Sequence, residues 1–309
     1  MNDIKYILIC GAGMMGKNIA FVMASNPAYQ VGVYDLYETD VPGGIRANTR
    51  QLIAKGALTE EELDARLSRI SFTTDLDSEL VSRADLVIEA VFEDMKIKRE
   101  TFAKLEARCR PDTIFCTNSS VMSPSEISAE LKHRERFVGT HFWNPGHLIP
   151  LVEVVKSDAS SDEVAQTVME VLFSVGKEPV LCKKDVPGFI ANRMQHALWR
   201  EAISIVERGI ADPATVDKAV RYSFGLRLPQ LGPMENADMV GTDLTYNIHD
   251  YILKDLEDSH EPSPLLTRLR DEGKLGFKTG EGFQTWTPQQ IEQSKEALND
   301  YLVDMLYGK

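Results

Sequence analysis

Short runs of apolar residues alternate with helix-length segments through the first half of the chain. Many of these runs are continuously aliphatic, which is typical of strands buried on both faces of a parallel sheet. The predicted strands are IKYILIC (4–10), VGVYD (31–35), RISFTT (69–74), DLVIEAV (85–91), TIFCTN (113–118), RFVGTHF (136–142), LVEVV (151–155) and PVLC (179–182). This alternation predicts a doubly wound α/β domain.

Capping residues mark the helix starts between these strands. Thr59, Ser123 and Ser160 are each followed three residues later by glutamate, and Pro124 suits a first helical position, so we expect helices to begin there. An amphipathic helical hairpin over 45–69 joins the second and third strands.

Strand signals end near residue 188, after the segment KKDVPGF. Apolar positions then follow the helical period, which predicts a smaller all-helical second domain. We place the division between residues 185 and 186, with a cofactor domain at 1–185 and a helical domain at 186–309. The predicted helices are 189–209, one opening at Asp212–Pro213, 236–256, and an amphipathic one opening at Thr287–Pro288.

Composition is that of an ordinary globular protein, with 43% apolar and 26% charged residues among 309. The 47 acidic and 34 basic residues give a formal charge of −13, which disfavours nucleic acid and anionic lipid as partners. No apolar run reaches the roughly 20 residues of a membrane span. We expect a cytoplasmic protein that binds phosphate only at a local site.

The four cysteines are widely spaced and form no CxxC pair, so we expect reduced, packed thiols. His133, His141 and His147 are spaced by eight and six residues, which puts no two of them on one helical face. We therefore expect no metal site. The cysteines are Cys10, Cys109, Cys116 and Cys182.

A glycine-rich turn follows the first predicted strand directly and opens a helix, in the string GAGMMG (11–16). In this setting Gly11 makes the tight turn, Gly13 lets the backbone approach a pyrophosphate and Gly16 lets the helix pack on the sheet. The phosphates would lie on the helix N-terminus, beside Met14 and Met15. These features are typical of a Rossmann-type dinucleotide site.

The second predicted strand ends at Asp35, 24 residues after Gly11, where an acidic residue can bind a ribose 2′-hydroxyl. Leu36 and Tyr37 follow it, and no arginine is present there for a 2′-phosphate. The sequence therefore predicts NAD rather than NADP as cofactor.

A histidine and a glutamate follow at the edge of this domain, in HFWNPGHLIPLVEVV (141–155). His141 ends one predicted strand, and Glu153 lies twelve residues on, in the next. Such a pair is suited to general acid and base catalysis. A structural histidine stays the alternative from these residues alone.

The same string resembles the HFFNPxxxMxLVEVV motif of the 3-hydroxyacyl-CoA dehydrogenase family. Five further strings match that family in order: ADLVIEAVFEDMKIK, TNSS, KKDVPGFIANR, GPMENADMVGTD and KLGFKTGEGF. The resemblance extends from Ile7 to about Phe283.

The resemblance implies roles for individual residues. His141 would take the hydroxyl proton as hydride leaves for the nicotinamide, and Glu153 would orient the imidazole and favour its charged form. Ser120 would hydrogen-bond the reacting oxygen. Asn192, on the first helix of the second domain, would be another polar contact to substrate, so that the site would form between the domains.

The resemblance also implies further cofactor contacts. Asn144 would lie close to the histidine and the nicotinamide. Glu93, Lys98 and Lys278 correspond to residues that contact the dinucleotide, although an ordinary surface charge is the alternative for each of these three.

Evidence on the substrate is divided. The segment 224–238, FGLRLPQLGPMENAD, departs from the family pattern and resembles relatives that oxidise free hydroxy acids or alcohols, such as L-gulonate, carnitine and pyridine-carboxylate dehydrogenases. There Arg227 could clamp a carboxylate. Against this, the 45–69 hairpin resembles the one that receives CoA, with Lys55 at a CoA-contacting position and Asn48 in place of a serine. We favour a 3-hydroxyacyl-CoA such as 3-hydroxybutyryl-CoA, with a free hydroxy acid as the alternative.

Two other classes of function remain as alternatives for this sequence. The β-hydroxyacid dehydrogenases of the 6-phosphogluconate type share this layout, but they use a catalytic lysine. A dinucleotide-binding protein without activity is the other. The apolar helix face from Ile190 to Val206 favours a homodimer through the second domain, with a buried central helix as the alternative.

Overall fold

The computed structural model describes residues 4–308, which form two compact units. The first comprises the described chain up to Ala191 together with the segment from Leu298 on, and the second comprises Asn192–Ala297. The predicted division after residue 185 thus differs from the observed one, above all because the end of the chain belongs to the first unit.

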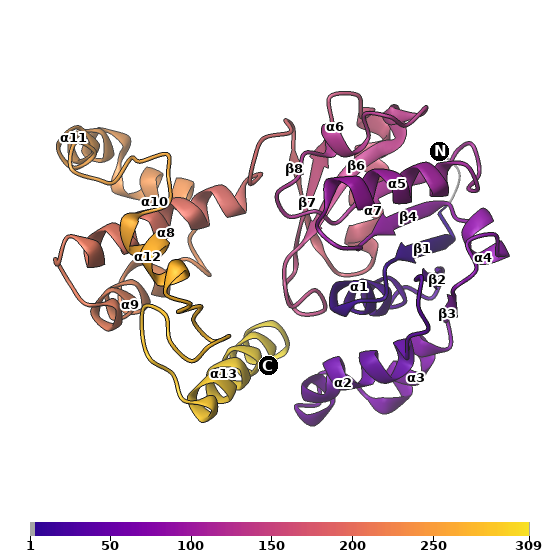
Figure 1. Cartoon of the computed structure of the whole chain (residues 1–309), viewed down its shortest axis with the longest axis horizontal. Coiled ribbons are helices and arrows are strands. Elements are labelled where there is room, and N and C mark those ends of the chain that lie inside the picture. Colours follow the sequence, from indigo (N-terminus) through magenta and orange to yellow (C-terminus); the bar gives the residue numbers. More distant parts are fainter. Residues whose placement is uncertain (1–3, 309) are drawn as a thin grey trace. The chain divides into compact units, whose positions relative to one another are not determined.

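All eight predicted strands are present in one sheet of the first unit, in the order β3-β2-β1-β4-β5-β6-β7-β8 (Figure 1). Strands β1 to β6 are parallel, whereas β7 pairs antiparallel with β6 and parallel with β8. The strands are β1 (Tyr6–Cys10), β2 (Gln30–Tyr34), β3 (Ile70–Thr73), β4 (Leu86–Glu89), β5 (Ile114–Thr117), β6 (Phe137–Phe142), β7 (Leu151–Lys156) and β8 (Glu178–Cys182).

Helices cover both faces of this sheet. They are α1 (Met14–Met23), α2 (Val41–Ala54), α3 (Glu60–Leu67), α4 (Glu79–Ser82), α5 (Met95–Glu106), α6 (Pro124–Ile127), the 3-10 turn η1 (Arg134–Arg136) and α7 (Asp162–Ser174). In β1, Ile7 and Ile9 pack with α1, α2, α3 and α7, whereas Leu8 and Cys10 pack with α4, α5 and α6. This two-sided burial explains the continuous apolar runs and confirms the α/β fold class.

Local capping chemistry largely follows the sequence. Thr59 and Glu62 form a capping box on α3, and the Ser123 hydroxyl accepts the Glu126 N–H at the start of α6. The predicted cap at Ser160 is wrong, because Ser161 caps α7 while Ser160 donates to a backbone carbonyl of β6. The Ser160 hydroxyl instead accepts the Ser157 N–H at 2.7 Å.

The second unit is helical apart from isolated bridges between residues 276 and 285. The stretch predicted as a single helix over 236–256 is broken at Gly241, whose φ of 101° lies outside the helical region. The helices are α8 (Ala191–Glu207), α9 (Pro213–Arg221), the 3-10 turn η2 (Phe224–Leu226), α10 (Pro233–Val240), α11 (Thr242–Ile252), α12 (Pro264–Asp271) and α13 (Pro288–Tyr307), whose last residues belong to the first unit.

Two features of the described chain bear on its environment. None of the described helices is both long and apolar enough to cross a membrane. All four cysteines are free thiols; Cys10, Cys116 and Cys182 are buried and Cys109 is half-buried, as expected.

Candidate active site

The glycine turn between β1 and α1 is closely constrained by its surroundings. Gly11 adopts a φ of 109°, and a Cβ at this position would lie 2.6 Å from the carbonyl oxygen of Ala90. A Cβ at Gly16 would lie 1.8 Å from the carbonyl oxygen of Gly11. A Cβ at Gly13, by contrast, would meet nothing within 4 Å, so the space in front of this residue is open to a ligand.

The N-terminus of α1 is directed into this open space without a side-chain cap. Gly13 is its N-cap residue, and Met14 and Met15 form its first positions, so the early amides keep their capacity to donate. Asp35, directly after β2, accepts the Ala12 N–H at 2.6 Å and so joins the carboxyl end of β2 to the turn. Free amides on one side and a carboxylate on the other fit the pyrophosphate and the ribose of a dinucleotide.

An ionic cluster lies beyond the carboxyl ends of β4 and β5. Lys98 is 1% exposed and lies between two carboxylates, with its Nζ 2.7 Å from Glu89 and 3.2 Å from Glu93. Glu93 also accepts the Ser119 hydroxyl and the Ser120 N–H, the latter at 3.1 Å. Burial would raise the pKa of Glu93, but these bonds and Lys98 outweigh it and lower the pKa. Lys98 therefore holds Glu93 ionised, and Glu93 in turn positions the Ser120 backbone.

His141 and Glu153 are brought together by the antiparallel pairing of β6 and β7, in which they are direct register partners. The distance from His141 Nδ1 to Glu153 Oε2 is 2.8 Å. His141 is 4% and Glu153 0% exposed, so this contact is shielded from water. Since His141 ends a parallel strand, the pair lies at the same edge of the sheet as the glycine turn.

Glu153 receives four hydrogen bonds, which keep its carboxylate ionised inside the protein. Oε2 accepts from His141 and from the Trp143 indole at 3.3 Å, and Oε1 accepts from the Ile190 and Ala191 amides at 2.8 and 3.0 Å. Burial would raise the pKa of Glu153, but the bonds from His141 and the two amides more than offset it and lower the pKa.

The two amides reach Glu153 because of a strained turn at the end of the first unit. Phe189 has a φ of 50°, the one positive φ among the described residues other than glycine. Its ring is buried, with its centroid 5.8 Å from that of the His141 imidazole. The Trp143 ring centroid lies 5.3 Å from the same imidazole. Strain of this kind persists where surrounding contacts enforce it, and here it aims consecutive amides at one oxygen.

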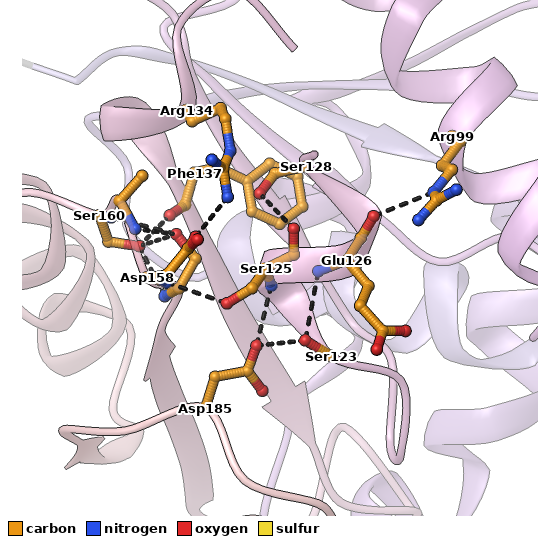
Figure 2. Close-up of polar contacts among 12 residues, drawn as sticks. Arg99, Ser123, Ser125, Glu126, Ser128, Arg134, Phe137, Asp158, Ser160 and Asp185 are labelled. Carbon is orange, nitrogen blue, oxygen red and sulfur yellow. Dashed lines mark hydrogen bonds and ion pairs between the residues drawn. The ribbon is translucent and has the colours of Figure 1, made fainter. Parts of the chain in front are cut away.

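The segment that leads to this turn is anchored at Asp185 (Figure 2). Its carboxylate accepts the Ser123 hydroxyl and, at 2.9 Å, the Ser125 N–H at the start of α6. The Ser125 hydroxyl in turn accepts the Asp158 N–H at 2.9 Å. Asp185 thereby fixes the chain four residues before Phe189 to the start of α6.

The loop after β6 carries Asn144, which is exposed. It lies against α1, since a Cβ at Gly146 would lie 3.2 Å from Met15 Cε. Lys177, which is buried, donates from Nζ to the carbonyls of Gly146 and Ile149 at 2.8 and 2.7 Å, and burial lowers its pKa to about 8. This lysine pins the loop between His141 and Glu153 to the first unit.

Three predicted site residues belong to the second unit. Asn192 directly follows Ala191, whose amide binds Glu153. Arg227 is exposed after η2, and Lys278 is exposed between α12 and α13.

The predicted CoA contacts on the hairpin are engaged elsewhere. Lys55 forms ion pairs with Asp300 and Asp304 of α13, and Asn48 donates from Nδ2 to Asn18 Oδ1 of α1 at 2.7 Å. Among the described residues, no group of three or more His, Cys, Asp or Glu residues that could hold a metal ion is found.

Several residues of the site were not found from the sequence. Trp143 lies two residues after His141, just past the end of β6, and its half-buried indole could have been noticed as a hydrogen-bond donor. Lys177 and Asp185 have no local signal, because each binds atoms more than twenty residues away. The Ile190 and Ala191 amides depend on the backbone of a turn and carry no side-chain pattern at all.

A glycine turn with open amides, an acidic residue at the end of β2 and a buried histidine–carboxylate pair together define a dinucleotide-dependent dehydrogenase. Comparison with known families agrees. Residues 6–186 match the family model "3-hydroxyacyl-CoA dehydrogenase, NAD binding domain", and residues 188–286 match "3-hydroxyacyl-CoA dehydrogenase, C-terminal domain". The chain belongs to the 3-hydroxyacyl-CoA dehydrogenase family, and it is an NAD-dependent dehydrogenase that acts on a CH–OH group.

Individual relatives differ in substrate. The 5-formyl-3-hydroxy-2-methylpyridine 4-carboxylate 5-dehydrogenase of Mesorhizobium japonicum is 34% identical over 293 residues, covering 94% of this chain and 93% of that protein. A solved structure of an enzyme of that name, described as an NAD+-dependent dismutase, has a TM-score of 0.89 at 32% identity, covering 98% of this chain and 97% of the other. The (S)-3-hydroxybutyryl-CoA dehydrogenase PaaH1 of Ralstonia eutropha has a TM-score of 0.77 at 29% identity, with 92% and 100% covered.

Proposed function

We propose that this chain interconverts a hydroxy compound and its carbonyl counterpart, with His141 as the group that exchanges the proton of the reacting oxygen. Bound NAD supplies the nicotinamide ring that exchanges the hydride. The buried His141–Glu153 contact of 2.8 Å carries this proposal.

The direction of the hydrogen bond within the pair determines which nitrogen reacts. Glu153 is held ionised and can only accept, so the proton of the neutral imidazole lies on Nδ1. Nε2 then carries the free lone pair and takes the hydroxyl proton during oxidation. The resulting imidazolium is stabilised by Glu153, and in reduction Nε2 returns the proton.

The remaining predicted residues have supporting roles in this proposal. Ser120 would hydrogen-bond the reacting oxygen, with its backbone fixed by Glu93. Asn192 would be the second polar contact to the substrate. The proposed cofactor contacts are the glycine turn, Asp35, Glu93, Lys98, Asn144 and Lys278. Lys98 is buried and would act by holding Glu93 in place.

Two classes of substrate fit membership of the family. A 3-hydroxyacyl-CoA is favoured by the names of the matching family models. A free hydroxy acid is favoured by the TM-score of 0.89 to the pyridine-carboxylate enzyme, and the exposed Arg227 would then bind the substrate carboxylate.

We further propose that the working form is a homodimer built through the second unit. Ser204 is the single buried residue of 192–297. Helices α8, α10 and α11 leave large apolar side chains exposed, more than a monomer in water commonly leaves uncovered. A second copy presents the same surface and can cover it symmetrically.

The proposed chemistry is tested by His141→Gln, which keeps a polar side chain of similar size. We expect turnover, followed by NADH absorbance, to fall by about 10²–10⁴-fold, because proton exchange at Nε2 is lost. The dissociation constant for NADH should stay near the wild-type value. His133→Gln, at an exposed histidine, is the matched control. Full activity of His141→Gln on every substrate that the wild type accepts would refute the proposal.

The substrate panel contains 3-hydroxybutyryl-CoA, acetoacetyl-CoA and the free acids hydroxybutyrate, gulonate and carnitine. If Arg227 binds a carboxylate, Arg227→Met should lower kcat/KM for the free acid by about tenfold or more. An unchanged kcat/KM for the free acid would remove Arg227 from the site.

A further inference from the structure

The last turns of α13 are an integral part of the first unit. Val303 is 2% exposed and lies in the same apolar core cluster as Ile19 and Leu52, and Leu302 packs against that cluster. The matched C-terminal family model ends at residue 286, before α13 begins at Pro288. The helix α13 thus lies outside the range of that model, and its end is fixed by burial of apolar surface.

The end of α13 places two carboxylates on Lys55, the C-cap residue of α2. Lys55 Nζ lies 2.7 Å from Asp304 Oδ1 and 3.3 Å from Asp300 Oδ1, and it donates to the Asp300 carbonyl at 3.1 Å. Gln51 Nε2, one turn earlier on α2, lies 3.5 Å from Asp300 Oδ1. The hydrogen bond to Asp304 is the main reason that the pKa of Lys55 is raised.

Arg46 and Arg66 of the α2–α3 hairpin are also engaged within the protein, whereas Arg50 is exposed on α2. Arg46 is paired with Asp64 and, at 3.5 Å, with Glu60. The Arg66 guanidinium lies over the ring of Phe21, 4.5 Å from its centroid. A phosphate group that approached Lys55 would meet a positive charge that already has partners, together with the carboxylates of Asp300 and Asp304.

We infer that the end of α13 is a specificity element, because Asp300 and Asp304 engage Lys55 and keep it from binding the phosphates of CoA. The enzyme is thereby reserved for hydroxy acids without CoA. The inference rests on the proposed function and selects the second of its two substrate classes. CoA carries several phosphate charges, each of which would be repelled by the two aspartates. A small carboxylic acid has no group that must approach the hairpin, so α13 leaves its binding unaffected.

The test is calorimetric titration of free CoA, and separately of inorganic phosphate, into the full chain saturated with NADH. The variants are Asp300→Asn/Asp304→Asn, the same pair with Lys55→Met, and Glu292→Gln as a control in the exposed first half of α13. The wild type and the control should bind CoA too weakly to measure at millimolar concentration. The double aspartate variant should bind CoA about tenfold or more tightly than the wild type, because two like charges are removed. Adding Lys55→Met should abolish that gain.

Kinetics give the second arm. The wild type should show a kcat/KM on a free hydroxy acid of the panel about tenfold or more above that on any hydroxyacyl-CoA. Micromolar binding of CoA to the wild type, preference for a thioester, or equal CoA binding by the wild type and the double variant would each overturn the inference. These outcomes are separate from failure of the proposed function, which is read from turnover by His141→Gln. If the double variant has a lower Tm than the wild type, the inference is judged from the binding of CoA to the wild type alone.

Discussion

The two units of this chain bury their apolar residues to very different extents. The first unit has apolar clusters on both faces of its sheet, whereas Ser204 is the one buried residue of the second unit. Both units have amphipathic helices with similar sequence patterns. The comparison teaches that an apolar helix face identified in a sequence says nothing about what covers it. In the first unit the sheet covers it, and in the second we propose that a second copy of the chain does so.

The same difference explains where the buried His141–Glu153 pair is located. An ionised carboxylate can be kept out of water only where several donors are held in place around it. Glu153 has such donors from β6, from the loop after it and from the turn at Phe189, all within the well-packed first unit. Sparse packing, as in the second unit, suits contacts that form with another molecule.

The largest expected effect concerns self-association through the second unit. Leu244 and Ile248 lie one turn apart on α11 and are 49% and 48% exposed. Leu244→Glu/Ile248→Glu should convert a dimer of twice 34.6 kDa to monomer by sedimentation, with the dissociation constant raised roughly a hundredfold, since two charges would be buried. His249→Glu on the same helix is the control. A wild type that sediments as a monomer at every concentration would contradict the proposed dimer.

A smaller effect concerns the first unit and acid pH. Burial, and then the charge of Lys177, lower the pKa of His147 from 6.5 to about 4. Between these values the unfolded chain binds the proton and the folded chain does not, so the free energy of unfolding decreases as the pH falls from 6.5 towards 4. At about 1.4 kcal/mol for each pKa unit, His147 accounts for up to about 3 kcal/mol of this loss.

His147→Gln should remove that part of the pH dependence, as measured by urea unfolding at neutral pH and near the lower pKa. His260→Gln, at an exposed histidine of the second unit, should keep the wild-type dependence. Identical pH profiles for His147→Gln and the wild type would show that His147 is not held neutral by its surroundings.

The smallest expected effect sharpens the role of the donors around Glu153. Trp143→Phe keeps an aromatic ring beside His141 but removes the indole N–H, so kcat should fall by roughly threefold with little change in KM. Trp199→Phe, at an exposed indole of α8, is the control. A change in KM alone would indicate a contact with substrate instead.

The strands, and the meeting of His141 with Glu153 on neighbouring strands, could be predicted because their signals are local. Continuous aliphatic runs specify strands buried on both faces, and a glycine turn between strand and helix specifies its own backbone. The single helix predicted over 236–256 was wrong because helical periodicity continues through Gly241, where the backbone turns to positive φ. The adjacent serines 160 and 161 could not be told apart, since both can cap.

The sequence by itself determined the order of the strands along the chain, the glycine turn, the acidic residue at the end of β2 and the identity of His141 and Glu153. Tertiary structure alone decided which donors hold Glu153, where Asp185 and Lys177 bind, and that the end of α13 packs beside Lys55. The physical reason is range. Propensity, capping and periodicity act over a few residues, whereas these contacts join atoms far apart in the chain, and no local pattern specifies a partner that folding brings near.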